Sequence, residues 1–337
     1  MKKEPFTDKL YKASQGIAAA VVVTLGIGLL IQSIGELVGL STLVTIGAVT
    51  KTLLIPGLGM GISYYLKTDI LTMLSATAAG VIGGRAYTFS DGVLSLKSGE
   101  PVGALVAIAI AIVIGTFLFN KTRFNMILVP FASILISGLV GYALSSPIAF
   151  MLTSVSSLIT SSVAGFPLLS SMVLGLVFGM LILSPASSAA IALALQLDGP
   201  AGAAALIGCS VQFTVFAFLS LRENDAGTFL GQLIITPKLQ TGNIIKHPKV
   251  ALFPLLLGTI LAPVGVLVFN LEATAEIAGM GLCALVAIFG IASSQGMAAT
   301  FSYLFVVIVL PALLSLLFKP LLIKSNLLKP NDLKITI

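Results

Sequence analysis

Polar side chains inside or next to apolar stretches are the residues of this sequence that could do chemistry. Glu100 stands where one apolar stretch begins, and Gln212 lies within another. An amide or carboxylate that leaves water must find hydrogen-bond partners, because burying it without them is costly. Such groups can bind another helix or the hydroxyl groups of a polar solute, so both residues are candidates for a binding site.

A second group of polar residues lies in the second half of the sequence. Its members flank apolar stretches that end or are interrupted: Ser187, Ser188, Glu223, Asn224, Gln240, Asn243 and His247. We expect this group to bind solute, with the serines at a half-helix terminus and the amides meeting hydroxyl groups. A solvated cap is the alternative for the charged members, and a structural role is the alternative for the histidine. Nothing here resembles a Ser-His-Asp triad or paired catalytic carboxylates, so no autonomous catalytic site is expected.

Three ionisable residues in the first half have open alternatives. Lys51 suits either a solute pathway or a snorkelling lysine beside a helix kink at Pro56. Arg85 and Glu100 could form an ion pair across the loop between them. Alternatively, Glu100 complements the start of a helix, because Pro101 suits the first helical position and a carboxylate there meets the positive end of the helix dipole.

The composition identifies the solvent in which these residues work. The chain of 337 residues is 57% hydrophobic and 9% charged, with a mean hydropathy of +1.12, whereas a soluble domain carries about 25% charged residues. Roughly ten apolar runs are long enough to cross a hydrocarbon core about 30 Å thick. The sequence therefore predicts an all-α polytopic membrane protein with the lipid bilayer as its environment.

The counts of special residues exclude several function classes. The formal net charge is +6, but the basic residues lie in short connections and tails, where they indicate membrane topology and not nucleic-acid binding. Cys209 and Cys283 lie in apolar segments and His247 is the only histidine. These residues support neither a disulfide framework nor a metal site, and no phosphate-binding loop is present, so no cofactor is expected.

The apolar runs divide the chain into candidate membrane segments. They are residues 15–37, 41–66, 69–85, 101–120, 125–146, 167–184, 200–221, 250–270, 274–294 and 299–323, with aqueous loops at 86–99 and 222–249. The positive-inside bias places the N-terminus and the basic stretches at 238–249 and 319–334 in the cytoplasm, and residues 271–276 outside. One crossing is then mismatched, which predicts re-entrant or broken helices.

Four stretches depart from simple spanning helices. Pro185 and the serines around it predict a half-helix, residues 226–237 predict a hairpin or an interfacial segment, and Gly296 lies in a polar break at residues 292–296. Residues 148–165 predict an amphipathic helix in the membrane interface, because apolar residues recur at helical spacing opposite hydroxyl groups. The expected organisation is one transmembrane domain over 1–337, with helices in 1–147, the amphipathic helix at 148–165, and re-entrant elements in 166–337.

Several stretches together resemble one known family. The strongest are Pro185-Ala186-Ser187-Ser188-Ala189-Ala190 and Asn243-Ile244-Ile245-Lys246-His247-Pro248, with Gly99-Glu100-Pro101 as a weaker piece. They resemble the membrane IIC component of the sugar phosphotransferase system, and more narrowly the IIC-like branch that includes the perfringolysin-regulator proteins. The resemblance implies a homodimer in the bacterial cytoplasmic membrane that binds a sugar or sugar-like polar solute between re-entrant hairpins. It also implies a separate IIB protein as partner, since no fused IIA or IIB domain is expected in this chain.

Two departures from the family pattern affect the expected function. Many sugar-type IIC proteins carry a Glu-Pro pair where this chain has Gln240-Thr241, and His247 replaces an asparagine. The chain also has no Trp and six Tyr, although sugar sites commonly use aromatic platforms. The resemblance therefore implies a solute transporter of the IIC type, or alternatively a IIC-like membrane sensor or regulator without phosphotransfer.

Overall fold

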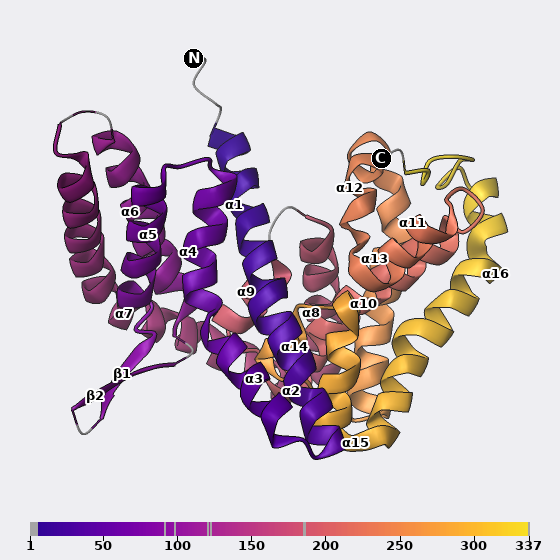
Figure 1. Ribbon diagram of the computed structural model, residues 1–337. Coiled ribbons are helices and arrows are strands. Elements are labelled where there is room, and N and C mark those ends of the chain that lie inside the picture. The colour runs from indigo at the N-terminus through magenta and orange to yellow at the C-terminus, as the bar shows by residue number, and fades with distance from the viewer. Residues whose placement is uncertain are drawn as a thin grey trace. The chain divides into compact units, whose positions relative to one another are not determined.

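The computed structural model describes residues 6–90, 92–97, 99–119, 121, 123–184 and 187–335, and these residues are predominantly helical (Figure 1). Contacts within the chain define two compact units. Unit 1 comprises Met1–Gln32 and Ser41–Val155, and unit 2 comprises Ser33–Leu40 and Ser156–Ile337. Residues 33–40, which contain the end of α2 (Ile27–Val38), belong to unit 2, and the chain passes to the rest of unit 2 within one long helix, α7 (Asn125–Gly165).

The helices are those of a multi-spanning membrane protein, as predicted. In the described part of the chain, 6 helices are long and apolar enough to cross a membrane, or up to 7 if one bent pair counts as a span. The structure has fewer spanning helices than the ten predicted segments because two segments join and others form short helices. The last two segments join over Cys283–Lys324, and Ile70–Gly83 and Pro167–Leu183 are shorter apolar helices. The segment predicted at 125–146 continues through residues 148–165 in α7.

Unit 1 contains the first helices and a hairpin. Its elements are α1 (Phe6–Val21), a π-helical turn (Val22–Gly26), the start of α2 (Ile27–Val38), α3 (Ser41–Thr52), α4 (Leu54–Tyr65), α5 (Ile70–Gly83), β1 (Tyr87–Ser90), β2 (Val93–Leu96), α6 (Pro101–Leu118) and most of α7. Helices α3 and α4 meet at a bend of 51°. Because Pro56 has no N–H for the Thr52 carbonyl oxygen, the hydrogen-bond ladder cannot continue across this bend.

Small residues let the helices of unit 1 approach closely. A Cβ atom added to Gly16 of α1 would lie 2.5 Å from the carbonyl oxygen of Gly61 in α4. No side chain fits at that distance, so glycine is required on both helices. Contacts of this kind are typical of membrane proteins, where close packing holds helices together in the absence of a hydrophobic driving force between them.

The segment predicted as an aqueous loop at residues 86–99 contains a β-hairpin. Tyr87 pairs with Leu96 and Phe89 pairs with Leu94, so these four side chains share one face, and all of them except the intermediate Tyr87 are exposed. Alternation with Thr88 and Ser95 on the other face is the pattern of a two-stranded ribbon. The prediction of a loop at residues 86–99 rested on the length of the segment between apolar runs and did not take this alternation into account.

Helix α7 does not end where the amphipathic helix was expected to begin. It continues without a break through Pro147 to Gly165, over 41 residues. Hydroxyl groups along residues 148–165 bond to carbonyl oxygens of their own helix, as Ser154 and Ser162 do with Phe150 and Leu158 at 2.8 and 2.7 Å. Intrahelical bonds satisfy these hydroxyls without water. Residues 148–165 are therefore helical, as expected, but they continue α7 instead of forming a separate helix, and their position in the membrane interface stays a prediction.

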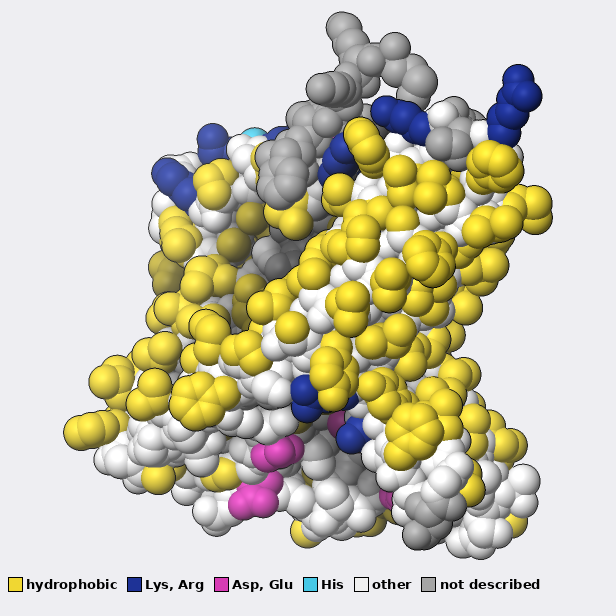
Figure 2. Space-filling view, turned by 90° about the vertical axis from the view of Figure 1, so that its left-hand side faces the viewer, with side chains coloured by type: hydrophobic (Ala, Val, Ile, Leu, Met, Phe, Trp, Pro, Cys, Tyr) yellow, Lys and Arg dark blue, Asp and Glu magenta, His cyan; other side chains and the backbone are white. Residues whose placement is uncertain are grey.

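Apolar side chains form much of the outer surface of α7. Phe131, Leu139 and Phe150 are exposed by 65%, 64% and 73%. Figure 2 shows a face covered mainly by apolar side chains, with charged side chains mostly toward its upper and lower parts. Exposed apolar area on this scale is unfavourable in water but suits contact with lipid chains.

Unit 2 contains the remaining helices around one buried helix. Its elements are the end of α7, α8 (Pro167–Leu183), α9 (Ser188–Ala194), α10 (Gly199–Leu219), α11 (Ala226–Leu230), a π-helical turn (Gly231–Ile235), a 3₁₀ turn (Pro237–Gln240), α12 (Thr241–Lys246), a 3₁₀ turn (Pro248–Ala251), α13 (Leu252–Pro263), a π-helical turn (Val264–Val268), α14 (Ala275–Ala278), a 3₁₀ turn (Cys283–Leu285), α15 (Val286–Leu304), a π-helical turn (Phe305–Val309) and α16 (Leu310–Lys324). Helix α10 packs against α8, α13 and α16, and nearly all its side chains are buried.

The predicted interruptions of unit 2 are present as short or broken helices. Helix α9 has 7 residues, too few to span a bilayer. Residues 226–235 form one short helical segment that ends at Thr236, where the backbone becomes extended. Gly296 interrupts α15 with φ 83° and ψ 179°, a conformation that glycine adopts without strain. Pro185 and Ala186 lie outside the described residues.

Candidate functional site

Most of the predicted site residues meet at one end of the buried helix α10. Glu223 and Asn224 lie in the turn that follows α10, and Gln240 and Asn243 lie in the 3₁₀ turn and in α12. Local capping sets the course of this part of the chain. Asp225 begins α11 by accepting the Thr228 N–H at 2.7 Å, and this hydrogen bond lowers the pKa of the Asp225 carboxyl group.

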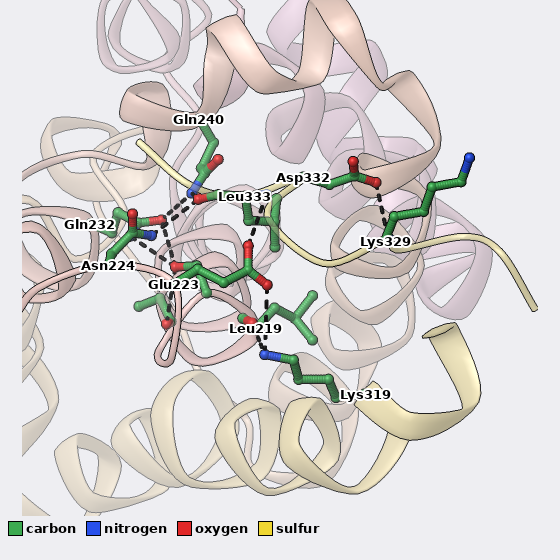
Figure 3. A network of polar contacts seen from close by, with 11 residues as sticks. Leu219, Glu223, Asn224, Gln232, Gln240, Lys319, Lys329, Asp332 and Leu333 are labelled. Atoms are coloured by element: carbon green, nitrogen blue, oxygen red, sulfur yellow. Dashed lines mark hydrogen bonds and ion pairs between the residues drawn. The ribbon is translucent and has the colours of Figure 1, made fainter. Parts of the chain in front are cut away.

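A chain of buried amides runs through this region (Figure 3). Gln240 donates from Nε2 to Gln232 Oε1 at 2.8 Å, and Gln232 donates from Nε2 to Ser220 Oγ at 3.0 Å. Asn243 donates from Nδ2 to Gln240 Oε1 at 2.8 Å. Three of these side chains are fully buried, those of Gln232, Gln240 and Ser220. Because water cannot reach them, their hydrogen bonds to one another satisfy their donors and acceptors.

The same amides hold a segment from the far end of the chain. Gln240 Nε2 and Asn224 Nδ2 both donate to the Leu333 carbonyl oxygen, at 2.9 and 3.1 Å. Asn243 Nδ2 donates to the Lys334 carbonyl oxygen at 3.1 Å. We call Glu223, Asn224, Gln240 and Asn243 the peptide clamp, and residues 332–335 the resident segment.

Main-chain N–H groups of the resident segment complete the contact. Leu333 N donates to Glu223 Oε2 at 3.2 Å, and Ile335 N donates to Asn224 Oδ1 at 2.8 Å. Figure 3 shows the Glu223 and Asn224 side chains directed toward this segment. The clamp therefore contacts donors and acceptors of the main chain, and the Leu333 side chain is fully buried beside it.

Charged groups surround the clamp. Lys319 of α16 donates from Nζ to the Leu219 carbonyl oxygen at 2.6 Å and lies 4.0 Å from Glu223 Oε1. His247 Nε2 lies 3.8 Å from Asp332 Oδ1. The predicted residue His247 thus reaches the resident segment through this contact, at the exposed edge of the network.

Gln212 lies deeper along α10 and has no contact with the clamp among the hydrogen bonds of the described residues. Its Nε2 donates to the carbonyl oxygens of Gly208 and Pro254, both at 3.1 Å, and so joins α10 to α13. Its Oε1 is buried without a hydrogen-bond partner in the described part of the chain. The amide nitrogen serves helix packing, and the amide oxygen is a buried acceptor without a bonded donor among the described residues.

The two predicted serines hold α9 in place. Ser187 Oγ accepts the Ala190 N–H at 3.3 Å and begins the helix, as expected for a half-helix terminus. Ser188 Oγ donates to the Gly279 carbonyl oxygen at 2.7 Å. Nearby, Lys238 Nζ donates to the Ser184 carbonyl oxygen at 2.6 Å, and burial lowers the pKa of this ammonium group. Both serines have structural partners and lie apart from the clamp residues in the sequence.

Two ionisable residues of unit 1, Glu100 and Arg85, have structural roles. Glu100 accepts the N–H groups of Val102 and Gly103, at 2.6 and 2.5 Å, and caps α6. Arg85 Nη2 donates to Ser146 Oγ at 2.9 Å, and the guanidinium carbon lies 5.0 Å from the centre of the Tyr142 ring. The ion pair considered between Arg85 and Glu100 is therefore replaced by a helix cap and a cation–π contact.

Three members of the network were missed from sequence. Gln232 satisfies the same criterion that identified Gln212, an amide inside an apolar stretch, and could have been found. Lys319 and Leu333 gave no comparable signal, because a basic residue at a helix end and a leucine near basic residues are common. Their contacts join positions about 100 residues apart, as with Leu219 and Lys319.

The arrangement favours binding over catalysis. Neutral amides and one carboxylate offer several donors and acceptors at fixed positions, which suits hydroxyl groups or peptide groups equally. The clamp holds neither a nucleophile paired with a base nor a second carboxylate that could exchange protons with Glu223. The geometry thus supports recognition of a neutral polar ligand.

Comparisons with known proteins give one family. Residues 11–335 match the family described as "Phosphotransferase system, EIIC". A search of curated proteins found no match. The match extends over both units and includes all the predicted site residues.

Proposed function

Because the chain belongs to the EIIC family of the phosphotransferase system, we propose that it carries a sugar or sugar-like polar solute across the bacterial cytoplasmic membrane. The family and the apolar helices make it an integral, multi-spanning membrane component of that system. The observation that supports a sugar-like solute is the network of buried neutral amides at the end of α10. The amides can give up their hydrogen bonds to one another and form hydrogen bonds to the hydroxyl groups of a solute instead.

The proposed solute pathway lies in unit 2, along α10. Gln212 offers a buried, unpartnered amide oxygen within the helix, and Gln232, Gln240 and Asn243 lie toward its end. Gln212 and Ser220, whose hydroxyl group accepts the Gln232 amide, are eight positions apart, or roughly 12 Å at 1.5 Å per residue. A solute that moved along α10 would meet neutral polar groups at both positions, as transport through a membrane interior requires.

Charge supports a cytoplasmic position for the clamp. Lys246, Lys249 and Lys324 lie in the same parts of unit 2 as the clamp, whereas Asp198 and Glu272 lie near the other end of α10, where Asp198 accepts the Ala275 N–H at 2.7 Å. Basic residues favour the cytoplasmic side of a membrane. A separate IIB protein in the cytoplasm would then approach the clamp end of unit 2. The homodimer expected for the family remains a prediction.

A membrane sensor or regulator without phosphotransfer is the second candidate, and one observation favours it. The clamp residues bind one another and the resident segment, so their polar groups are already satisfied. Gln240 also stands where many family members carry the glutamate that engages the sugar. A protein that senses a ligand would need binding but not release on the opposite side.

Ligand-dependent stabilisation tests the proposed function. Purified protein would be heated with hexoses, pentoses, hexitols and their phosphate esters, since a ligand that binds only the folded state raises Tm by mass action. We expect at least one class to raise the Tm of the unmodified chain, and Asn243→Ala to weaken that effect. Thr259→Ala is the matched control, because the one hydrogen bond of Thr259 Oγ1 among the described residues goes to the Leu255 carbonyl oxygen of its own helix. No response to any class would contradict the proposal.

A further inference from the structure

The contact between the clamp and the resident segment is directed at main-chain groups. Asn224 accepts the Ile335 N–H through Oδ1 and donates to the Leu333 carbonyl oxygen through Nδ2. In this two-point contact, Asn224 thus meets one donor and one acceptor of the main chain, on either side of Lys334. Any peptide main chain in the same conformation presents the same two groups, whatever its side chains.

The other clamp residues extend the same kind of recognition. Glu223 accepts the Leu333 N–H, Gln240 donates to the Leu333 carbonyl oxygen and Asn243 donates to the Lys334 carbonyl oxygen. The N–H groups of residues 333 and 335 and the carbonyl groups of residues 333 and 334 are thus all bound by side chains. The segment also has two main-chain hydrogen bonds of a turn, from Asp332 N to the Lys329 carbonyl oxygen at 3.1 Å and from Lys334 N to the Asn331 carbonyl oxygen at 3.2 Å.

Side-chain selectivity in this contact comes from one position. Leu333 is fully buried, whereas Lys334 is exposed, and Asp332 and Ile335 are partly exposed. The clamp thus combines hydrogen bonds that any main chain can make with one closed apolar position. This is the recognition mode of a peptide-binding site, in which main-chain bonds supply affinity and one pocket supplies specificity.

We propose that the peptide clamp is a binding site for a peptide main chain in the conformation of residues 332–335, which leave a turn, with an aliphatic side chain at the position of Leu333. Residues 332–335 are its resident ligand, and a peptide of the same chemistry can replace them. This inference goes beyond the proposed function, because it concerns a peptide ligand and not a transported solute. It also implies that release of the resident segment exposes the amides of the clamp.

Binding of a labelled peptide to the full-length chain tests this inference. The probe is a fluorescent peptide with the sequence of residues 329–335, and its anisotropy is measured against purified protein in detergent. In a Leu333→Asp chain the introduced charge cannot remain buried beside Glu223, so the resident segment leaves the clamp. We expect this variant to bind the probe at least 10-fold more tightly than the unmodified chain, in which the resident segment competes.

Two controls separate the clamp from other surfaces. Adding Asn224→Ala to the Leu333→Asp chain is expected to weaken probe binding at least 10-fold, because the two-point contact is lost. Lys334→Ala is expected to behave as the unmodified chain, because only the carbonyl group of Lys334 contacts the clamp. Equal binding by all four chains, or equal binding of a probe that carries Leu333→Asp, would overturn the inference.

A second measurement needs no variant and remains decisive if Leu333→Asp fails to fold. Hydrogen exchange of the unmodified chain is followed over residues 329–335, with and without an excess of the same peptide made isotopically heavy so that its fragments differ in mass. We expect exchange at Leu333 and Ile335 to speed up at least 10-fold when the peptide is present. Unchanged exchange at saturating peptide would mean that the segment is a fixed part of the fold, and would overturn the inference.

Discussion

Substitution of Gln240 tests the hydrogen-bond network most sharply, because this fully buried amide is its central member. Gln240→Leu removes three bonds, but each partner keeps another one. Gln232 Oε1 keeps Ser220 Oγ at 3.4 Å, the Leu333 carbonyl oxygen keeps Asn224 Nδ2, and Asn243 Nδ2 keeps the Lys334 carbonyl oxygen. At about 0.5–1.5 kcal/mol for each lost bond, the folded state should lose roughly 1.5–4.5 kcal/mol.

Gln240→Glu adds a dependence on pH that Gln240→Leu lacks. The introduced carboxyl group would face Gln232 Oε1 and the Leu333 carbonyl oxygen, which the native amide contacts at 2.8 and 2.9 Å. Two acceptors at this distance disfavour the carboxylate, so its pKa in the folded state should rise above the usual value of about 4.3. The folded state then binds more protons than the unfolded state between these two pKa values.

The sign of the effect follows from this difference in protons bound. Stability of the Gln240→Glu chain should fall as pH rises from about 4.3 through the raised pKa, by up to about 1.4 kcal/mol per pH unit. The assay is Tm in one detergent at several pH values between 5 and 8, with the curve of the unmodified chain subtracted. Ile245→Glu is the control, since Ile245 is 77% exposed. A Gln240→Glu curve parallel to that of Ile245→Glu would refute the reasoning.

Three further predictions concern single contacts, and each is measured by Tm. Gln212→Leu should change stability by less than about 1 kcal/mol, because removal of the buried Oε1, which has no hydrogen-bond partner among the described residues, offsets the loss of the two Nε2 bonds; a large loss would show that these two bonds are essential for packing. Glu100→Ala should destabilise the chain by about 0.5–2 kcal/mol through loss of the α6 cap, and an unchanged Tm would contradict that role. Gly208→Val should lower the free energy of unfolding by roughly 3 kcal/mol or more, because a Cβ atom at Gly208 would lie 2.3 Å from the Gly175 carbonyl oxygen. A Cβ atom at Gly242 would meet no atom within 4 Å, so Gly242→Ala should be neutral or stabilising. Equal effects of the two glycine substitutions would contradict the packing described.

The membrane fold and its interruptions were predictable because their signals are local. Composition and run length identify spanning helices, and Gly296 marks a break in α15 by its own conformational freedom. Pro147 did not end α7, since tertiary contacts and a lipid environment favour a continuous helix over its local preference. The alternation of Tyr87 and Phe89 with polar residues was too short to outweigh the prediction of a loop.

The candidate site was predictable by residue type but not by partner. Gln240 and Asn243 stood out as amides beside apolar stretches, and the structure brings them together with Glu223 and Asn224. Leu333, the partner shared by Glu223, Asn224 and Gln240, is an ordinary apolar residue about 100 positions along the chain. A contact at that separation depends on how α10 and α16 pack, and no pattern in a single sequence reports it.

Transport by this chain is tested most directly by uptake into proteoliposomes. Vesicles that contain the unmodified protein would be supplied with a radiolabelled form of whichever sugar, hexitol or phosphate ester raises Tm the most. We predict saturable uptake above that of empty vesicles, strongly reduced by Asn243→Ala and retained by Thr259→Ala. Uptake equal to that of empty vesicles, with a ligand that still raises Tm, would contradict transport and favour the sensor.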